Sequence, residues 1–249
     1  MKINALITGG AHRVGRAIAL DLAAHGFGVV IHANTSIDAA KTLADEITAS
    51  GGRAFAVQAD LTNTTEAMGL IDKATALAGN IDILVNNASI FEADDMASLD
   101  EELWDKHFAI HLKAPAFLTA ELARINKGAD ALVVNIIDHR VWRLKPTFIS
   151  YTLSKAALWT ATQTMAQALA PKIRVNAIGP GPALANDRQS AQDFADQVAT
   201  LILQRGPQLD EFGATIRYFW AAKSITGQMI ALDGGQHLSW QTPDSFAKE

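Results

Sequence analysis

Tyr151 and Lys155 stand four residues apart in a stretch, Tyr151–Ala170, whose apolar residues recur at helical spacing. Side chains four apart share one face of a helix, so the phenol and the ammonium are expected to lie together. A nearby ammonium favours the phenolate and lowers the tyrosine pKa, which gives a proton donor able to work near neutral pH. Such pairs are also common on helix surfaces without any catalytic role. The pair therefore indicates catalysis only if other segments place a cofactor and a substrate beside it.

A glycine-rich segment follows the first apolar run, with the sequence Thr8-Gly9-Gly10-Ala11-His12-Arg13-Val14-Gly15, and a predicted helix comes directly after it. Glycines allow a tight turn and a close approach of the backbone, and the first N–H groups of a helix can bind phosphate. Glycine spacing alone is weak evidence for a nucleotide site. Its place between the first strand and the first helix strengthens it.

The second predicted strand ends without a carboxylate, at His32-Ala33-Asn34-Thr35-Ser36. NAD sites usually place Asp or Glu there, to accept hydrogen bonds from the ribose 2′-hydroxyl. The donors His12, Arg13, His32 and Ser36 suit a 2′-phosphate instead, which favours NADPH over NADH. Asp60, after the third strand, could accept from the adenine amino group or could equally cap the next helix.

Short apolar runs alternate with longer amphipathic stretches along the chain, which predicts βαβ units in a doubly wound parallel sheet flanked by helices. The predicted strands are Ala5–Thr8, Gly28–His32, Ala54–Ala59, Ile83–Asn86, Ala131–Ile137, Arg174–Ala177 and Gln228–Leu232. The predicted helices include Arg13–Ala24, Ile37–Ser50, Thr64–Ala78 and Tyr151–Ala170. We expect a single α/β domain over residues 1–249. Residues 183–206 break the alternation after a late strand, which predicts a lid over the site, with an ordinary surface helix pair as the alternative.

Composition limits the possible partners. The net charge of −5 gives no reason to expect nucleic acid or a membrane surface as a partner. The absence of cysteine excludes disulfides, thiolate metal sites and cysteine nucleophiles, and no His-Glu-x-x-His pattern occurs, so we expect no metal. Without an apolar run of spanning length or a recognisable signal peptide, the sequence predicts a cytoplasmic protein.

Taken together, these motifs resemble the short-chain dehydrogenase/reductases over essentially the whole chain. The matching segments, in order, are Thr8-Gly9…Gly15, Asp60, Asn86-Asn87-Ala88, Tyr151-x-x-x-Lys155, Pro180-Gly181 and Leu232-Asp233-Gly234-Gly235. The resemblance implies a Rossmann-type sheet of about seven strands, hydride transfer from a nicotinamide cofactor, Tyr151 as proton donor and Lys155 on the nicotinamide ribose. It also implies a homotetramer built by late helices and the C-terminal segment, including Phe219, Trp220 and Trp240. The residues that it assigns to NADPH are Gly9, His12, Arg13, Val14, Gly15, His32, Ser36, Asp60, Leu61, Asn87, Ala88, Ser89, Tyr151, Lys155, Pro180 and Gly181.

Departures from the general family pattern resemble the pteridine reductase branch, including the bacterial dihydromonapterin reductases. Arg13 replaces a loop glycine, Asp138 stands where the catalytic serine is expected, and His111 replaces a helix asparagine. This resemblance implies that Arg13 contacts phosphate and pterin, that Ser89 lines the site, and that Phe91 stacks on the pterin. Asp138 and Tyr151 complete the predicted substrate site. Phe91 and His111 could instead be ordinary core side chains.

The chemistry of Asp138 favours a pterin independently of the resemblance. A serine hydroxyl can donate to a substrate carbonyl, whereas an ionised carboxylate can only accept. A pterin presents N–H donors and receives its proton on nitrogen. The sequence therefore predicts an NADPH-dependent dihydropterin reductase in which Asp138, Tyr151 and Lys155 are catalytic. The alternatives are a 3-oxoacyl thioester reductase, with Asp138 capping a turn, and a non-catalytic NADP-binding sensor.

Overall fold

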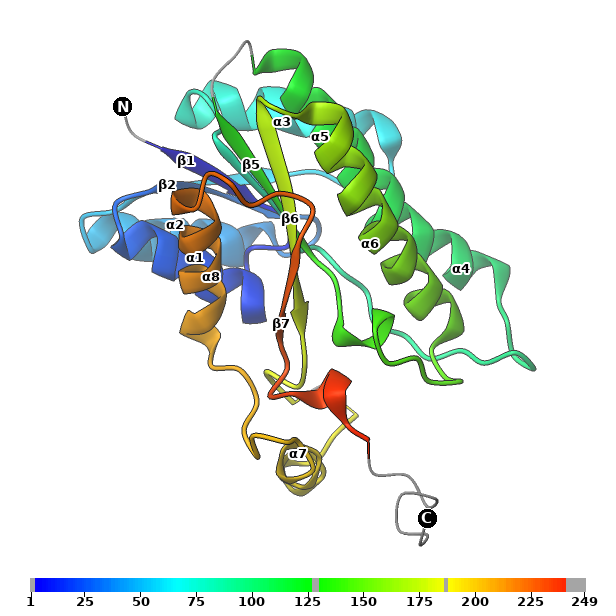
Figure 1. The fold of residues 1–249 in the computed structure, drawn as a ribbon. Coiled ribbons are helices and arrows are strands. Elements are labelled where there is room, and N and C mark those ends of the chain that lie inside the picture. The colour runs from blue at the N-terminus through cyan, green and yellow to red at the C-terminus, as the bar shows by residue number, and fades with distance from the viewer. Residues whose placement is uncertain (1–2, 127–129, 186–187, 241–249) are drawn as a thin grey trace, which may run out of the picture.

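The computed structural model describes residues 3–126, 130–185 and 188–240. Seven parallel strands form one sheet in the order β3-β2-β1-β4-β5-β6-β7, and helices cover both of its faces (Figure 1). The strands are β1 (Asn4–Ile7), β2 (Gly28–Ala33), β3 (Arg53–Gln58), β4 (Ile83–Asn86), β5 (Ala131–Ile136), β6 (Ile173–Pro180) and β7 (Met229–Leu232). The helices are α1 (Arg13–Ala24), α2 (Ile37–Ala49), α3 (Thr64–Ala78), α4 (Glu101–Phe108), α5 (Ala114–Ile125), α6 (Ile149–Leu169), α7 (Ala191–Ala199) and α8 (Leu209–Ala221). The prediction of a doubly wound parallel α/β sheet is confirmed.

Two hydrophobic layers enclose the sheet, because successive side chains of a strand point to opposite faces. In β1, Ala5 and Ile7 join the layer under α1, α2 and α8, whereas Leu6 joins the layer under α3, α5 and the end of α6. Every residue of β1, β2, β4 and β5 is buried. Strands covered on both faces read as continuous apolar runs, which is why the sequence located them to within one or two residues.

The order of the strands reverses between β1 and β4, because β2 and β3 lie on one side of β1 and β4 to β7 on the other. Loops leaving these two strands at their carboxyl ends therefore diverge and open a crevice, where ligands bind in open α/β sheets. The glycine loop follows β1, residues 87–91 follow β4, and residues 137–140 follow β5. The fold thus gathers the predicted site residues at one edge.

A π-helical turn, η1 (Ala109–Lys113), joins α4 to α5, and a short 3₁₀ turn, η2 (His139–Val141), follows β5. His111 lies in the π turn, and such turns often occur at functional sites. Residues 183–206 hold α7, which lies beyond the carboxyl edge of the sheet in Figure 1. The lid remains a prediction, and residues 186–187 within it lie outside the described residues.

One expectation about the surface is wrong. Phe219 is fully buried in the layer under α8, so it cannot contact another subunit. Trp220 is partly buried against the same layer, and Trp240 is 65% exposed. Along α8, the exposed aromatic residue is Tyr218.

Candidate active site

The glycine loop is locked against the end of β4. The Thr8 hydroxyl accepts from the backbone N–H groups of Asn87 and Ala88, at 2.9 and 3.0 Å, and the Asn87 amide donates to the carbonyls of Thr8 and Gly9. A side chain on Gly15 would meet the Gly9 carbonyl oxygen at 2.3 Å. The loop therefore requires glycine at this position, and Asn87 acts as a structural tie as well as a wall of the cavity.

Helix α1 begins at Arg13 with an uncapped end. His12 occupies the N-cap position without a side-chain hydrogen bond, and the first turn carries no acidic residue. Arg13, Val14 and Gly15, the first residues of this helix, line the same cavity as Gly9 and His12. An uncapped N-terminus beside glycines fits the pyrophosphate of a dinucleotide.

The crevice has two adjoining compartments. The inner one, of about 390 Å³, is lined by Gly9, His12, Arg13, Val14, Gly15, Asn87, Ala88, Ser89, Phe91, Ile136, Ile137, Asp138, Tyr151, Lys155, Pro180 and Gly181. The outer one, of about 420 Å³, shares Arg13, Val14, Phe91, Asp138, Pro180 and Gly181 with it and extends to Pro182, Ala183, Leu184, Arg188, Gln189 and Gln197. Most of the predicted cofactor and substrate residues thus share one cavity.

Four predicted cofactor residues do not line these compartments. His32 is buried, with Nδ1 accepting from the Gly9 N–H at 3.2 Å and Nε2 donating to the Ala59 carbonyl at 3.0 Å. Burial lowers the pKa of His32 to about 4, so this neutral ring supports the glycine loop and has no free donor for a phosphate. Leu61 is a core residue, and the Asp60 carboxylate accepts from the N–H and hydroxyl of Thr62. Ser36 lies at the N-cap of α2 with no side-chain capping bond.

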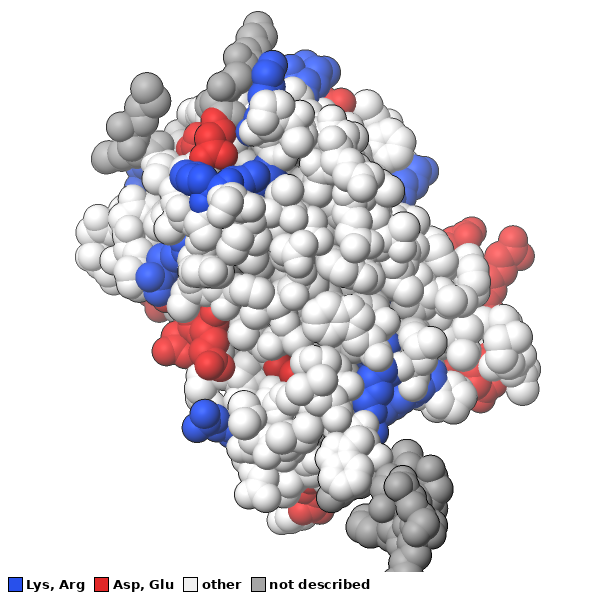
Figure 2. Space-filling model, viewed as in Figure 1, with Lys and Arg blue, Asp and Glu red and all other residues white. Residues whose placement is uncertain are grey.

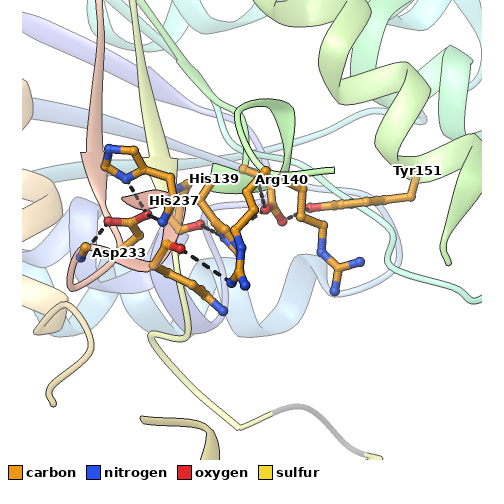
Figure 3. A network of polar contacts seen from close by, with 10 residues as sticks. His139, Arg140, Tyr151, Asp233 and His237 are labelled. Carbon is orange, nitrogen blue, oxygen red and sulfur yellow. Dashed lines mark hydrogen bonds and ion pairs between the residues drawn. The ribbon is translucent and has the colours of Figure 1, made fainter. Parts of the chain in front are cut away.

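Tyr151, Asp138 and Lys155 meet at the floor of the inner compartment. The Tyr151 hydroxyl donates to Asp138 Oδ2 at 2.9 Å, and the Lys155 ammonium donates to the Ile136 carbonyl at 2.8 Å. Figure 3 shows the phenol of Tyr151 reaching the carboxylate beside His139 and Arg140. Tyr151 and Lys155 lie in α6, as their four-residue spacing predicted, and Asp138 follows β5 at the start of η2.

The pKa of Tyr151 differs in direction from the expectation. Burial and the neighbouring Asp138 carboxylate raise the pKa of Tyr151 well above 10.0, whereas the sequence predicted that Lys155 would lower it. Burial acts to raise the pKa of Asp138, but hydrogen bonds from His139 and the Arg140 N–H outweigh it, and this pKa lies below its usual value. The site therefore holds an ionised Asp138 against a neutral Tyr151.

Burial lowers the pKa of Lys155 to about 8, with Asp138 acting in the opposite direction. The Lys155 ammonium lies 5.8 Å from the centre of the Tyr151 ring, and Lys155 lines the same cavity as Ser89 and Gly181. This places a cation where it can donate to a ribose hydroxyl. The described residues contain no group of three or more His, Asp or Glu side chains placed to hold a metal ion.

A second polar network positions the start of α6 and was missed from the sequence. The Asp94 carboxylate accepts from the N–H and hydroxyl of Ser150, and His107 Nδ1 donates to the Ser150 oxygen at 2.7 Å. Asp94 comes from the loop after β4 and His107 from α4, and both are buried. No spacing rule connects residues 94, 107 and 150, so only the fold brings them together.

His111 connects this helix to the loop that lines the cavity. Its Nε2 accepts from the Ile90 N–H and lies 2.9 Å from the Ser89 hydroxyl, so Nδ1 carries the proton and donates to Ser154. Burial, with Lys155 and His107 nearby, lowers the pKa of His111 well below its usual value. A neutral His111 therefore holds Ser89 in place from the π turn between α4 and α5.

The aromatic wall of the outer compartment contains one predicted and one unpredicted residue. The rings of Phe91 and Phe148 stack at 4.4 Å, and Phe91 meets Tyr151 edge-on at 4.7 Å. Phe148 precedes α6 with a φ of 58°, in the left-handed region that disfavours large side chains. Arg140 and Arg188 also line this compartment, and no motif pointed to them.

Comparisons with known proteins agree with this site. Residues 3–195 match the short chain dehydrogenase family. The chain is 57% identical to the FolM alternative dihydrofolate reductase 1 of Brucella suis, solved in complex with NADP, with a TM-score of 0.95 over 97% of this chain and 98% of that one. The Brucella canis protein, also complexed with NADP, is similar at 57% identity and a TM-score of 0.95, with 97% and 96% covered.

A more distant relative is the 3-oxoacyl-(acyl-carrier-protein) reductase of Staphylococcus epidermidis, 32% identical over 96% of this chain and all of that protein. The similarity to this relative covers nearly the whole chain, and the parallel sheet and the Tyr151–Lys155 pair are both consistent with the family match. The chain belongs to the short-chain dehydrogenase family.

Proposed function

We propose that this protein is an NADPH-dependent reductase of dihydropterins. The observation that carries the proposal is the 2.9 Å contact between Asp138 Oδ2 and the Tyr151 hydroxyl. An acceptor occupies the position from which a ketone reductase needs a donor to the substrate oxygen. The Brucella relatives named as dihydrofolate reductases, both bound to NADP, support the proposal.

The residues of the inner compartment fit NADPH. The uncapped start of α1 and the glycine loop accommodate the pyrophosphate, and Lys155 would hold the nicotinamide ribose. His12 is exposed beside the loop, and Ser36 has a free hydroxyl at the end of β2 where no carboxylate would repel a 2′-phosphate. When bound, the reduced nicotinamide supplies a hydride to the C6 carbon of the dihydropterin, and the adjoining N5 nitrogen then requires a proton.

Tyr151 is placed to give that proton to nitrogen. Although its pKa is raised, a nitrogen that has gained an electron pair is a strong base and can take a proton from a weak acid. The Lys155 ammonium stabilises the tyrosinate that results. Asp138 accepts from Tyr151 before the transfer and from substrate N–H groups during it, and Phe91 offers a flat face to the pterin ring.

The assembly and location of the protein are part of the same proposal. We propose a cytoplasmic homotetramer, in which Trp220, Tyr218 and the exposed Trp240 belong to the candidate contact surface and Phe219 does not. No helix within the described part of the chain is both long and apolar enough to cross a membrane.

The test compares NADPH oxidation with dihydromonapterin, dihydrobiopterin, dihydrofolate and acetoacetyl-CoA. We expect turnover of the dihydropterins, and a loss of roughly 10²–10⁴-fold in turnover for Tyr151→Phe, since that is the usual contribution of a positioned acid. Asp138→Ser should lose dihydropterin reduction while keeping its affinity for NADPH, and Asp138→Asn separates the charge from the shape. Reduction of acetoacetyl-CoA alone, improved by Asp138→Ser, would show a carbonyl reductase instead.

A further inference from the structure

Three arginines surround the outer compartment of the active site. Arg13 comes from the glycine loop, Arg140 from η2, and Arg188 from the segment after β6; we call these three residues the arginine rim. Among the described residues that line this compartment, Asp138 is the sole carboxylate. Among the described lining residues, positive charge therefore exceeds negative charge.

The rim is arranged around the stacked rings of Phe91 and Phe148. The guanidinium carbon of Arg140 lies 4.9 Å from the centre of Phe148, and that of Arg188 lies 5.2 Å from the centre of Phe91. Arg188 also donates to the Phe91 carbonyl at 3.0 Å. Each guanidinium carbon is also within 5.6 Å of the other ring of the pair, so both cations lie beside the stacked rings, at the rim of the compartment.

Arg140 carries positive charge that no described side chain neutralises. Its Nη1 is buried without a hydrogen-bond partner, and no described carboxylate lies within ion-pair distance of it. The nearby Asp138 accepts from Tyr151, His139 and the Arg140 backbone, and in Figure 3 the Arg140 guanidinium points away from that carboxylate. Buried donors without partners are costly, so an acceptor is expected at this position.

Two further cationic residues, Arg143 and Lys145, lie near Arg140. Burial, with Arg140 and Arg143 nearby, lowers the pKa of Lys145. Figure 2 shows Lys and Arg atoms gathered over η2 and the loop that follows it. A protein with a net charge of −5 thus concentrates cations at the mouth of its active site, where they raise the local concentration of an anionic ligand.

We propose that Arg140 and Arg188 of the arginine rim bind an anionic group on the side chain of the substrate, so that the enzyme prefers dihydropterins carrying a carboxylate or phosphate on the C6 substituent. The inference rests on the proposed function. A pterin ring bound beside Tyr151 and Phe91 in the inner compartment can extend its C6 substituent into the outer one, because the two compartments share Phe91, Asp138 and Pro180. Carboxylate and phosphate offer the same recognition chemistry to a guanidinium.

The experiment measures kcat/KM for three substrates at low and high salt. Dihydrofolate carries carboxylates, 7,8-dihydroneopterin phosphate carries a phosphate, and dihydrobiopterin is uncharged. We expect at least one anionic substrate to exceed dihydrobiopterin by about tenfold or more, with an advantage that shrinks as salt is added. Whichever anion is preferred identifies the natural source of the charge.

Arg188→Gln, on an exposed side chain, and Arg140→Gln should each lower the anionic-to-neutral ratio of kcat/KM about tenfold, mainly through KM. The ratio is measured within one variant, so a partly unfolded sample does not change it. Arg124→Gln is the matched control, because Arg124 is an exposed arginine of α5 that pairs with Glu121. It should leave the ratio unchanged.

Equal kcat/KM values for anionic and neutral dihydropterins, unaffected by Arg188→Gln, would overturn the inference and leave the proposed function intact. A wild-type protein that reduces none of the three substrates would overturn both. A preference for an anionic substrate that survives both arginine variants would also count against the rim, since the charge would then be recognised elsewhere.

Discussion

The carboxylate of Asp138 decides how Tyr151 behaves. The four-residue helix spacing predicted Tyr151 and Lys155 as neighbours from local geometry, and the family resemblance added Asp138. The sequence predicted the wrong direction for the pKa of Tyr151. That direction depends on which group lies nearest the hydroxyl, and the structure places Asp138 Oδ2 there while Lys155 donates to the Ile136 carbonyl. Contacts of this kind are tertiary and leave no mark in residue spacing.

Lys155 links the chemistry of the site to the stability of the protein. Burial lowers its pKa to about 8 from an ordinary 10.5. Below pH 8 the ammonium is charged in both the folded and the unfolded chain, so the cost of burying it is fully present. Between 8 and 10.5 the unfolded chain binds more protons, and the contribution of this group to the free energy of unfolding rises with pH.

Lys155→Met removes this titration. We expect the free energy of unfolding of the wild type, relative to Lys155→Met, to increase by up to about 3 kcal/mol between roughly pH 7 and 10, measured by urea denaturation. Over the same range kcat/KM of the wild type should fall above about pH 8 as the ammonium is lost. Lys41→Met, on an exposed lysine of α2, is the control and should show no such divergence. A constant difference between wild type and Lys155→Met would contradict a lowered pKa.

At the scale of elements, apolar periodicity located the buried strands and the helices α1, α2, α3 and α6, whereas α4, α5 and the π turn between them were not predicted. Hydrogen bonds across the fold anchor this region, through His107 to Ser150 and through His111 to Ser89 and Ser154. A π turn has no periodic signature of its own, because it depends on which backbone groups the neighbouring elements satisfy. The start of α6, and with it Tyr151, is thus positioned by α4 and the loop after β4.

Arg13 shows how one element constrains another. It starts α1 with a φ of 50°, a conformation that favours glycine, which the resemblance led us to expect at this position. Its guanidinium donates to the carbonyls of Ala185 and Leu184, at 2.9 and 3.3 Å, and so ties the glycine loop to the segment after β6. The expected contact of Arg13 with phosphate or pterin stays a prediction. In this structure the guanidinium N–H groups of Arg13 donate to backbone carbonyls of the protein.

Arg13→Gly and Arg13→Ala separate the backbone cost from the side-chain contact. Both variants lose the tie to residues 184–185, but only glycine relieves the left-handed conformation, which costs an L-residue roughly 1–2 kcal/mol. We expect Arg13→Gly to be more stable than Arg13→Ala by about 1 kcal/mol in thermal or urea unfolding. Equal stabilities, or a more stable alanine variant, would mean that residue 13 does not hold a positive φ in solution.

At the scale of the whole molecule, strand order alone placed the glycine loop, the asparagines after β4 and the Tyr151 pair at one edge of the sheet, as the alternating pattern predicted. The division of that crevice into two compartments was not predictable. It depends on the packing of Phe91 against Phe148 and on lining residues after β6 such as Leu184 and Arg188, which come from distant parts of the chain. The distribution of charge around the crevice likewise emerges only in three dimensions, since a net charge of −5 describes the surface as a whole.

The preference for NADPH over NADH depends on the charges around the crevice, and it can be tested at the end of β2. Ala33 is only 4% exposed, so a carboxylate there would be buried, whereas Asn34 is exposed directly after the strand. Asn34→Asp keeps the shape and adds one negative charge near the expected 2′-phosphate. Because two like charges a few ångströms apart repel by about 1–4 kcal/mol near a protein surface, we expect the Kd for NADPH to rise about tenfold or more while the Kd for NADH changes little.

Asn34→Ala is the matched control, since it removes the amide without adding charge and should leave the ratio of the two dissociation constants close to that of the wild type. Titration of cofactor fluorescence at two salt concentrations measures both constants. Added salt should weaken the effect of Asn34→Asp, because repulsion between exposed charges is screened within about 10 Å at 0.1 M. Equal affinities of the wild type for NADPH and NADH would contradict this prediction. They would show that the absence of a carboxylate after β2 does not select NADPH, and that the protein does not recognise the 2′-phosphate at the end of β2.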